Sequence, residues 1–291
     1  MGLRRDTGQN LLKSMQAKVS PVFHLFESQH QEAKAIFLTL GKQIRSKKAI
    51  ELLGKIEFLE LYADLMAKVH FEVEGLNFDI FKDFKEMKKS LRQIHHFKLA
   101  EKSLNDREQR LDIKFNGYRT HLEKYKKKLY TEAFDIIVGS TLKSWDDFHD
   151  KAMKASRGIK PLGIHTAVNQ IIQEELEFFQ LDKKGVMDSK ALKDTFEGLR
   201  TIIMLENLLI HLGFNSIFIT AIHQDIAALK DNLKPWYSNQ LSLQSLTHFL
   251  RDKPEAGKKY LDWLKELKEH KIALASQSEK QAHELFEKIL G

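Results

Sequence analysis

The sequence predicts an all-α protein, built as two pseudo-symmetric helical bundles with long helices. Residues that break helices are scarce, because the 291 residues include only 4 Pro and 14 Gly. Apolar side chains recur at spacings of three and four along almost the whole chain, as in helices with one buried face. The densest group of turn residues lies within 157–163 and indicates a linker. We therefore expect a tail over 1–20, a first half over 21–156 and a second half over 164–291.

The first two helices have clear local signals. Pro21 suits the first turn of a helix over 21–40, and Gly41 suits its end. A second helix is expected over 49–70, because its apolar residues share one face. These residues are Ile50, Leu53, Ile56 and Leu59.

The sequence of the rest of the first half predicts three more helices, over 79–104, 106–138 and 141–155. A turn at 75–77 precedes the first of them, and Gly139 with the following serine ends the second. The helix over 79–104 has a basic outer stripe at helical spacing, made of Lys82, Lys85, Lys89, Arg92 and His96.

The second half begins after a linker that contains Gly158, Pro161 and Gly163. Apolar periodicity predicts its helices over 164–180, 189–212, 217–232, 238–251 and 253–290. Pro235 falls between the third and fourth of these, and we expect it to separate or kink them.

Composition limits the classes of protein. The chain has no Cys, which excludes disulfides, thiolate metal sites and a Cys nucleophile. No signal peptide or membrane-spanning stretch is recognisable, so we expect a cytoplasmic location. The net charge is +7, from 47 Lys and Arg against 40 Asp and Glu, and this favours an acidic partner.

Two segments resemble each other at an offset of 142 residues, 84–92 and 226–234. Each is preceded by an apolar helix that starts with a lysine, Lys48 or Lys193. In both helices a second basic residue, Lys55 or Arg200, follows seven positions later. Seven residues are two helical turns, so each pair lies on one face. This pattern predicts an internal duplication.

This layout resembles the CHAD domain, the conserved-histidine α-helical domain. The stretch 191–206 is similar to the family's histidine-bearing helix, and 229–233 is similar to the segment that follows it. The resemblance covers roughly 21–285. It implies two homologous helical halves and a central groove that binds inorganic polyphosphate.

The sequence departs from the family pattern at the site itself. Lys48 and Lys193 stand where the family has its histidines. Glu51 and Phe196 stand where it has arginines three residues later. The family's Arg/Asn-Asp pair falls at His95-His96 and at Tyr237-Ser238.

The expected function is binding of polyphosphate or a similar phosphate-rich polyanion, without enzymatic activity. A polyanion site needs several Lys or Arg side chains that converge on one concavity. By resemblance the first candidates are Lys48, Lys55, Lys193 and Arg200. Lys88, Arg92, Lys230 and Lys234 would flank them from the second helix of each half.

Two other functions remain open. A protein–protein adaptor that has lost the polyanion site would explain the missing arginines, and the positive charge would also suit nucleic acid. No motif indicates a cofactor, a catalytic constellation or a metal. The neighbouring His95 and His96 diverge by about 100° on a helix. Asp146 and His149 share a helix face, but no motif supplies further ligands.

Overall fold

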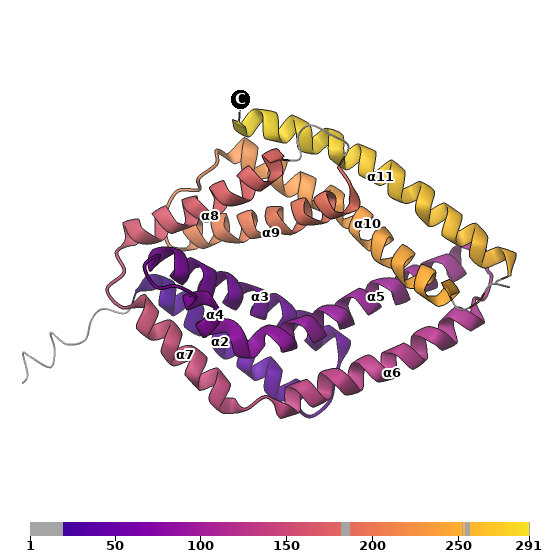
Figure 1. The fold of residues 1–291 in the computed structure, drawn as a ribbon, viewed down its shortest axis with the longest axis horizontal. Helices are drawn as coiled ribbons and strands as arrows, with labels where there is room; N and C mark the ends of the chain where they lie inside the picture. Colours follow the sequence, from indigo (N-terminus) through magenta and orange to yellow (C-terminus); the bar gives the residue numbers. More distant parts are fainter. Residues whose placement is uncertain (1–19, 182–186, 252, 254–256, 291) are drawn as a thin grey trace, which may run out of the picture.

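The computed structural model describes residues 20–181, 187–251, 253 and 257–290. Regular structure in these residues is helical, as the sequence predicts, and Figure 1 shows the helices arranged in an elongated, closed outline. None of the described helices is long and apolar enough to cross a membrane. In chain order the elements are α2 (Pro21–Leu40), α3 (Ser46–Val69), α4 (Leu76–Phe81), the 3₁₀ turn η1 (Lys82–Phe84), α5 (Lys85–Leu111), α6 (Asn116–Gly139), α7 (Leu142–Ser156), α8 (Pro161–Leu181), α9 (Ser189–His211), α10 (Thr220–Arg251) and α11 (Lys258–Leu290).

The observed helix boundaries agree best with the predicted ones where local sequence signals are strong. α2 has the predicted bounds and carries Pro21 in its first turn. α9 begins at the predicted residue because the Asp188 side chain accepts hydrogen bonds from two backbone amides of its first turn. The linker is shorter than predicted, since α8 already begins at Pro161.

The predicted helix boundary near residue 105 is wrong. α5 continues to Leu111, and the chain turns there because Asp112 adopts the left-handed conformation, with φ of 50°. An unpredicted break lies instead after α4, where η1 interrupts the helix predicted over 79–104.

The break predicted at Pro235 is also wrong, because α10 runs through this residue. A proline inside a helix removes one hydrogen bond and costs about 3 kcal/mol. Here the residues on either side compensate by burial, since Leu233 and Trp236 are both 0% exposed. Tertiary packing therefore overrides the local preference to end the helix. The last helix, α11, starts at Lys258 and not at residue 253.

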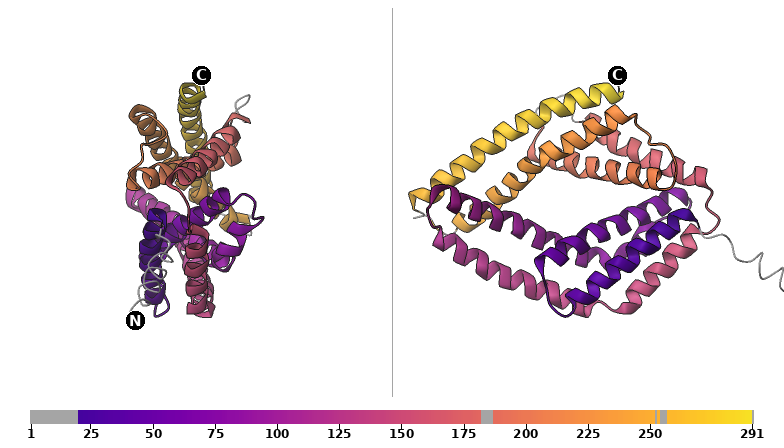
Figure 2. Two further views of the ribbon diagram at one scale, coloured as in Figure 1. Left: turned by 90° about the vertical axis from the view of Figure 1, so that its left-hand side faces the viewer. Right: turned by 180° about the vertical axis from the view of Figure 1, so that it is seen from behind.

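The two halves repeat one order of helix contacts. In the first half α2 packs on α3, α3 on α5 and α5 on α6. In the second half α8 packs on α9, α9 on α10 and α10 on α11 in the same sequence. Figure 2 shows a long two-helix hairpin in each half, formed by α5 with α6 and by α10 with α11. This repeated order is what a duplicated helical unit would produce.

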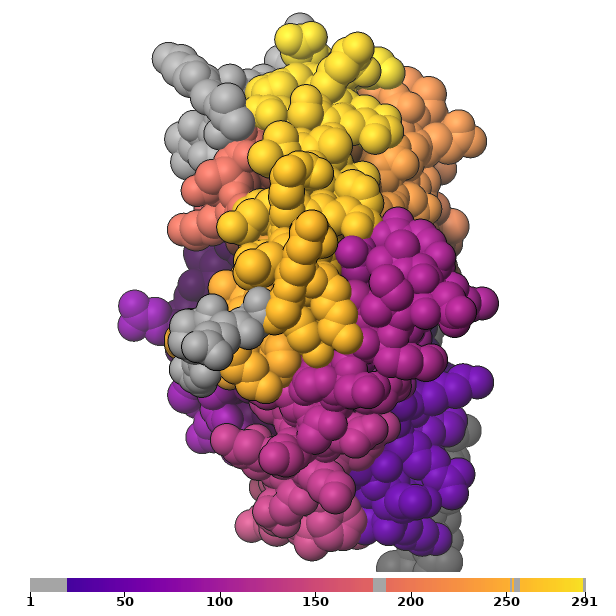
Figure 3. All heavy atoms as spheres, turned by 90° about the vertical axis from the view of Figure 1, so that its right-hand side faces the viewer, coloured from indigo at the N-terminus to yellow at the C-terminus, as the bar shows by residue number. Residues whose placement is uncertain are grey.

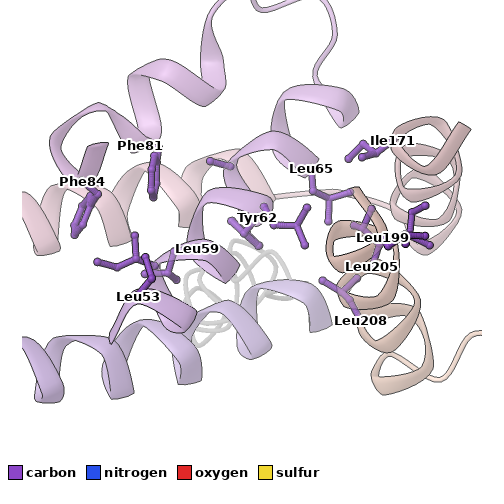
Figure 4. Packing of buried hydrophobic residues seen from close by; sticks show 14 of the residues in the cluster. Leu53, Leu59, Tyr62, Leu65, Phe81, Phe84, Ile171, Leu199, Leu205 and Leu208 are labelled. Carbon is purple, nitrogen blue, oxygen red and sulfur yellow. The ribbon is translucent and has the colours of Figure 1, made fainter. Parts of the chain in front are cut away.

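Two apolar cores join the halves. The larger core contains side chains of α3 together with side chains of α8 and α9, and Figure 4 shows Leu65 near Ile171 and Leu199. The smaller core lies at the far ends of the two hairpins, where Phe115 packs against Trp263. At that end of the molecule α11 lies against the α5–α6 turn (Figure 3). Apolar packing thus joins the halves at two separate places.

Buried carboxylates fix the turns that start two of the long helices. Glu108 on α5 accepts a hydrogen bond from the Phe115 amide (2.8 Å) and pairs with Arg119 (2.6 Å). Glu206 on α9 is 0% exposed and holds the turn before α10. Its three donors are the amides of Ile217 (2.7 Å) and Phe218 (3.2 Å) and Nδ1 of His223 (2.7 Å).

Candidate functional site

A cleft of about 1110 Å³ lies between the two halves, with α3 and α5 on one side and α9, α10 and α11 on the other. It is bordered by both apolar cores, since Leu53 of the larger and Trp263 of the smaller contribute to its lining. One face of α5 follows the cleft from Arg92 to Arg110. At 1.5 Å per residue this face is roughly 27 Å long. The cleft is therefore extended, and both halves form it.

The charged lining of the cleft has an excess of cations. Among the described residues seven Lys and Arg side chains line it, namely Arg92, Lys102, Arg107, Arg110, Arg200, Lys230 and Lys234. Five carboxylates line it as well, namely Glu57, Asp106, Glu197, Asp231 and Glu266. The lining is mixed in sign and carries two more positive than negative groups.

Glu57 lies at the centre of an ion-pair cluster that spans the two halves. Its carboxylate contacts Arg92 Nη2 at 3.4 Å and Arg200 Nη2 at 2.5 Å. Glu57 and Arg92 belong to the first half, on α3 and α5, whereas Arg200 comes from α9. The Glu57 side chain is only 12% exposed, so this bridge is partly shielded from water.

Two further carboxylates in the cleft each lie between two cations. Glu266 on α11 pairs with Arg107 and Arg110 on α5, which ties the ends of the halves together. Burial opposes ionisation of Glu266, but the hydrogen bonds from both guanidiniums outweigh it and lower its pKa. Asp231 on α10 pairs with Lys230 (3.1 Å) and Lys234 (2.7 Å).

Arg107 is the most enclosed cation of the cleft, with its side chain 7% exposed. Its guanidinium carbon lies 5.3 Å from the ring centroid of Trp263 and 5.7 Å from that of Phe115. Such cation–π contacts help to hold a buried guanidinium in place. Its Nε is buried, with no hydrogen-bond partner among the described residues.

Two histidines of α5 line the cleft beside the arginines. His96 Nε2 lies 3.0 Å from the Tyr237 hydroxyl, which is a hydrogen bond between the halves. Burial is the main cause that lowers the pKa of His96 to about 4, and the neighbouring His95, Arg92 and Lys193 lower it further. Burial also lowers the pKa of His95. Both rings are therefore neutral at pH 7 in the unliganded protein.

Four of the eight candidate cations line this cleft, namely Arg92, Arg200, Lys230 and Lys234. The other four lie outside the lining of this cleft. Lys55 turns toward α2, where it binds Gln29 and Glu32. Lys48 pairs with Glu51 at 2.8 Å, and Lys193 pairs with Glu197 at 3.8 Å. Lys88 pairs with Glu60 and lines a neighbouring hollow of about 400 Å³.

Three cations of α5 that line the cleft were not predicted from the sequence. Lys102, Arg107 and Arg110 continue the helical spacing that begins at Arg92. Extending the basic stripe within the predicted helix would have found Lys102, whereas the misplaced helix boundary near residue 105 hid the continuity to Arg107 and Arg110.

Asp146 and His149, which share a helix face, each contact a side chain of α2. Asp146 pairs with Lys34 at 2.6 Å, and His149 contacts Glu27 at 3.3 Å. Within the described part of the chain, no three His, Asp or Glu side chains are grouped so that they could hold a metal ion.

Comparison with known proteins finds no matching family model, curated protein or solved structure. The function must therefore be inferred from the chemistry of the cleft and from the sequence resemblance.

Proposed function

We propose that this chain is a non-enzymatic CHAD-like module that binds inorganic polyphosphate or a similar phosphate-rich polyanion in the cleft between its halves. One observation carries the proposal: the seven Lys and Arg side chains from both halves that line one extended cleft. The four of them on α5 follow that face of the helix for roughly 27 Å.

The residue types suit a chain of phosphates. A guanidinium offers a rigid fork of donors that matches two phosphate oxygens, and lysine adds charge without that geometry. Four of the seven cations are arginines, namely Arg92, Arg107, Arg110 and Arg200. A chain ligand that binds along such a lining releases its counterions, so its affinity falls steeply as salt is added.

The test compares two double variants that lose the same charge. Lys230→Gln with Lys234→Gln removes two cations from the cleft, whereas Lys48→Gln with Lys193→Gln removes two that do not line it. We expect the cleft variant to bind long-chain polyphosphate at least tenfold more weakly than wild type at low salt. The control should bind within about threefold of wild type, since exposed charges outside the site contribute little.

The measurement is a titration of each variant with polyphosphate at several salt concentrations. If wild type shows no affinity at low salt, the proposed function is rejected. If both double variants lose the same affinity, binding reflects the overall charge and not the cleft.

An adaptor function is the second candidate, because large apolar side chains on or beside α4 are exposed. Phe71 is 86% exposed, Phe78 is 52% exposed and Val73 is 46% exposed, all on or beside α4. Exposed apolar groups that gather on a surface are typical of protein-binding sites. A variant with Phe71→Ser and Phe78→Ser should lose any protein that co-purifies with wild type. The same variant should retain wild-type affinity for polyphosphate.

A further inference from the structure

The arginines of the cleft are already occupied by carboxylates of the protein itself. Glu57 contacts Arg92 and Arg200, and Glu266 contacts Arg107 and Arg110. Each carboxylate thus holds two guanidiniums, which is the arrangement that a phosphate group would need. All four arginines of the lining are engaged in this way.

Glu57 has the geometry of a bound ligand. It extends from α3 to one guanidinium of its own half and to one of the other half, with contacts of 3.4 and 2.5 Å. Its side chain is the less exposed partner, at 12%, while Arg92 and Arg200 are 32% and 39% exposed. The arginines can therefore be reached from the cleft, while the carboxylate fills the space between them.

We propose that Glu57 is an internal competitor for the anion site, and that a polyanion must take its place between Arg92 and Arg200. This inference rests on the proposed function, because it concerns the regulation of the same cleft. A phosphate chain carries more charge than a single carboxylate and bonds several cations at once, so it displaces Glu57. Isolated carboxylate ligands have no such advantage and are excluded. Glu57 thereby sets both the affinity and the selectivity of the site.

The decisive variant is Glu57→Gln, with Glu197→Gln as its matched control. Both substitutions remove one negative charge from the cleft lining. The Glu197 carboxylate, however, forms an ion pair only with Lys193 among the described residues, at 3.8 Å. We expect Glu57→Gln to bind polyphosphate about tenfold more tightly than wild type, which corresponds to about 1.4 kcal/mol. Glu197→Gln should improve the affinity less than threefold.

A thermal-unfolding measurement separates competition from a purely structural role. Without ligand, Glu57→Gln leaves two partly buried guanidiniums without their shared anion, so its melting temperature should fall. Polyphosphate should restore that temperature to the wild-type value, because it supplies the missing anion. A drop that polyphosphate does not reverse would mean that Glu57 only holds the halves together, and would overturn the proposal.

Glu57→Asp provides a second test in case the glutamine variant does not fold. The shorter side chain keeps its charge but cannot span both arginines, so its affinity should lie between those of wild type and Glu57→Gln. An affinity equal to that of wild type overturns the proposal.

The outcomes distinguish this inference from the proposed function. If wild type does not bind polyphosphate and Glu57→Gln does, the inference stands and the proposed function fails for the natural chain. If wild type binds and the two glutamine variants change affinity equally, the inference fails and the proposed function stands. If no variant binds, both are rejected.

Discussion

Two glycines in helix interiors should respond oppositely to the same substitution. Gly54 lies inside α3 and Gly198 lies inside α9. A Cβ added at Gly54 would meet no atom within 4 Å. A Cβ added at Gly198 would lie 2.5 Å from Phe179 Cζ and 2.6 Å from Glu175 Oε2. Gly198 is therefore required by the close packing of α9 on α8, whereas Gly54 is not required by any contact.

The expected magnitudes follow from two terms. Alanine is better than glycine in a helix interior by roughly 0.5–1 kcal/mol, so Gly54→Ala should stabilise the fold by that amount. Gly198→Ala gains the same term but forces an overlap that costs about 1–3 kcal/mol. The overlap is hard to relieve, because Phe179 is 3% exposed and its ring stacks on that of Phe286, with the ring centroids 5.1 Å apart. We expect a difference of about 1–3 kcal/mol between the two variants, in favour of Gly54→Ala.

Urea unfolding followed by circular dichroism measures this difference. The fit requires a single cooperative transition, and the slopes of both variants should equal the wild-type slope. If Gly198→Ala proves as stable as Gly54→Ala, the packing of α8 on α9 described above is incorrect.

Three further predictions concern stability. Glu206→Ala should destabilise the fold by about 3–5 kcal/mol in urea unfolding, because it removes the acceptor of three hydrogen bonds, and Glu206→Gln should cost less. Burial is the main cause that lowers the pKa of His30 to about 4. The contact of 3.0 Å between His30 Nε2 and the Trp145 carbonyl oxygen raises the pKa but does not outweigh burial. As the pH falls, the His30 ring is therefore protonated in the unfolded chain before it is protonated in the folded protein. The free energy of unfolding should decrease by on the order of 3 kcal/mol as the pH falls from about 6.5 to 4. His30→Asn should flatten that dependence. Pro235→Ala restores a backbone donor toward Asp231, so it should raise the urea midpoint without adding helix by circular dichroism.

Much of the fold can be read from the sequence because helices depend on local signals. The 3.6-residue spacing of apolar side chains, Pro21 at a helix start and the scarcity of other breakers determine that the chain is helical and where α2 lies. The linker region and the order of helices in each half follow from the same kind of information. These features need no knowledge of what packs against what.

The wrongly predicted helix boundaries depend on side-chain contacts that helical periodicity does not reveal. α10 continues through Pro235 because Leu233 and Trp236 are buried by other helices, and α5 ends at Leu111 because the turn after it is held by Glu108. A sequence window around Pro235 contains the cost of the proline but not the burial that offsets it.

The sequence by itself determined that this is a basic, helical protein with cations repeated at helical spacing in both halves. Only the tertiary structure decided which of those cations meet. Arg92 and Arg200 share the cleft, while Lys55 turns toward Glu32 on α2. Helical periodicity states which residues lie on one face of a helix, but the packing of the halves at two separate cores decides which faces enclose the cleft.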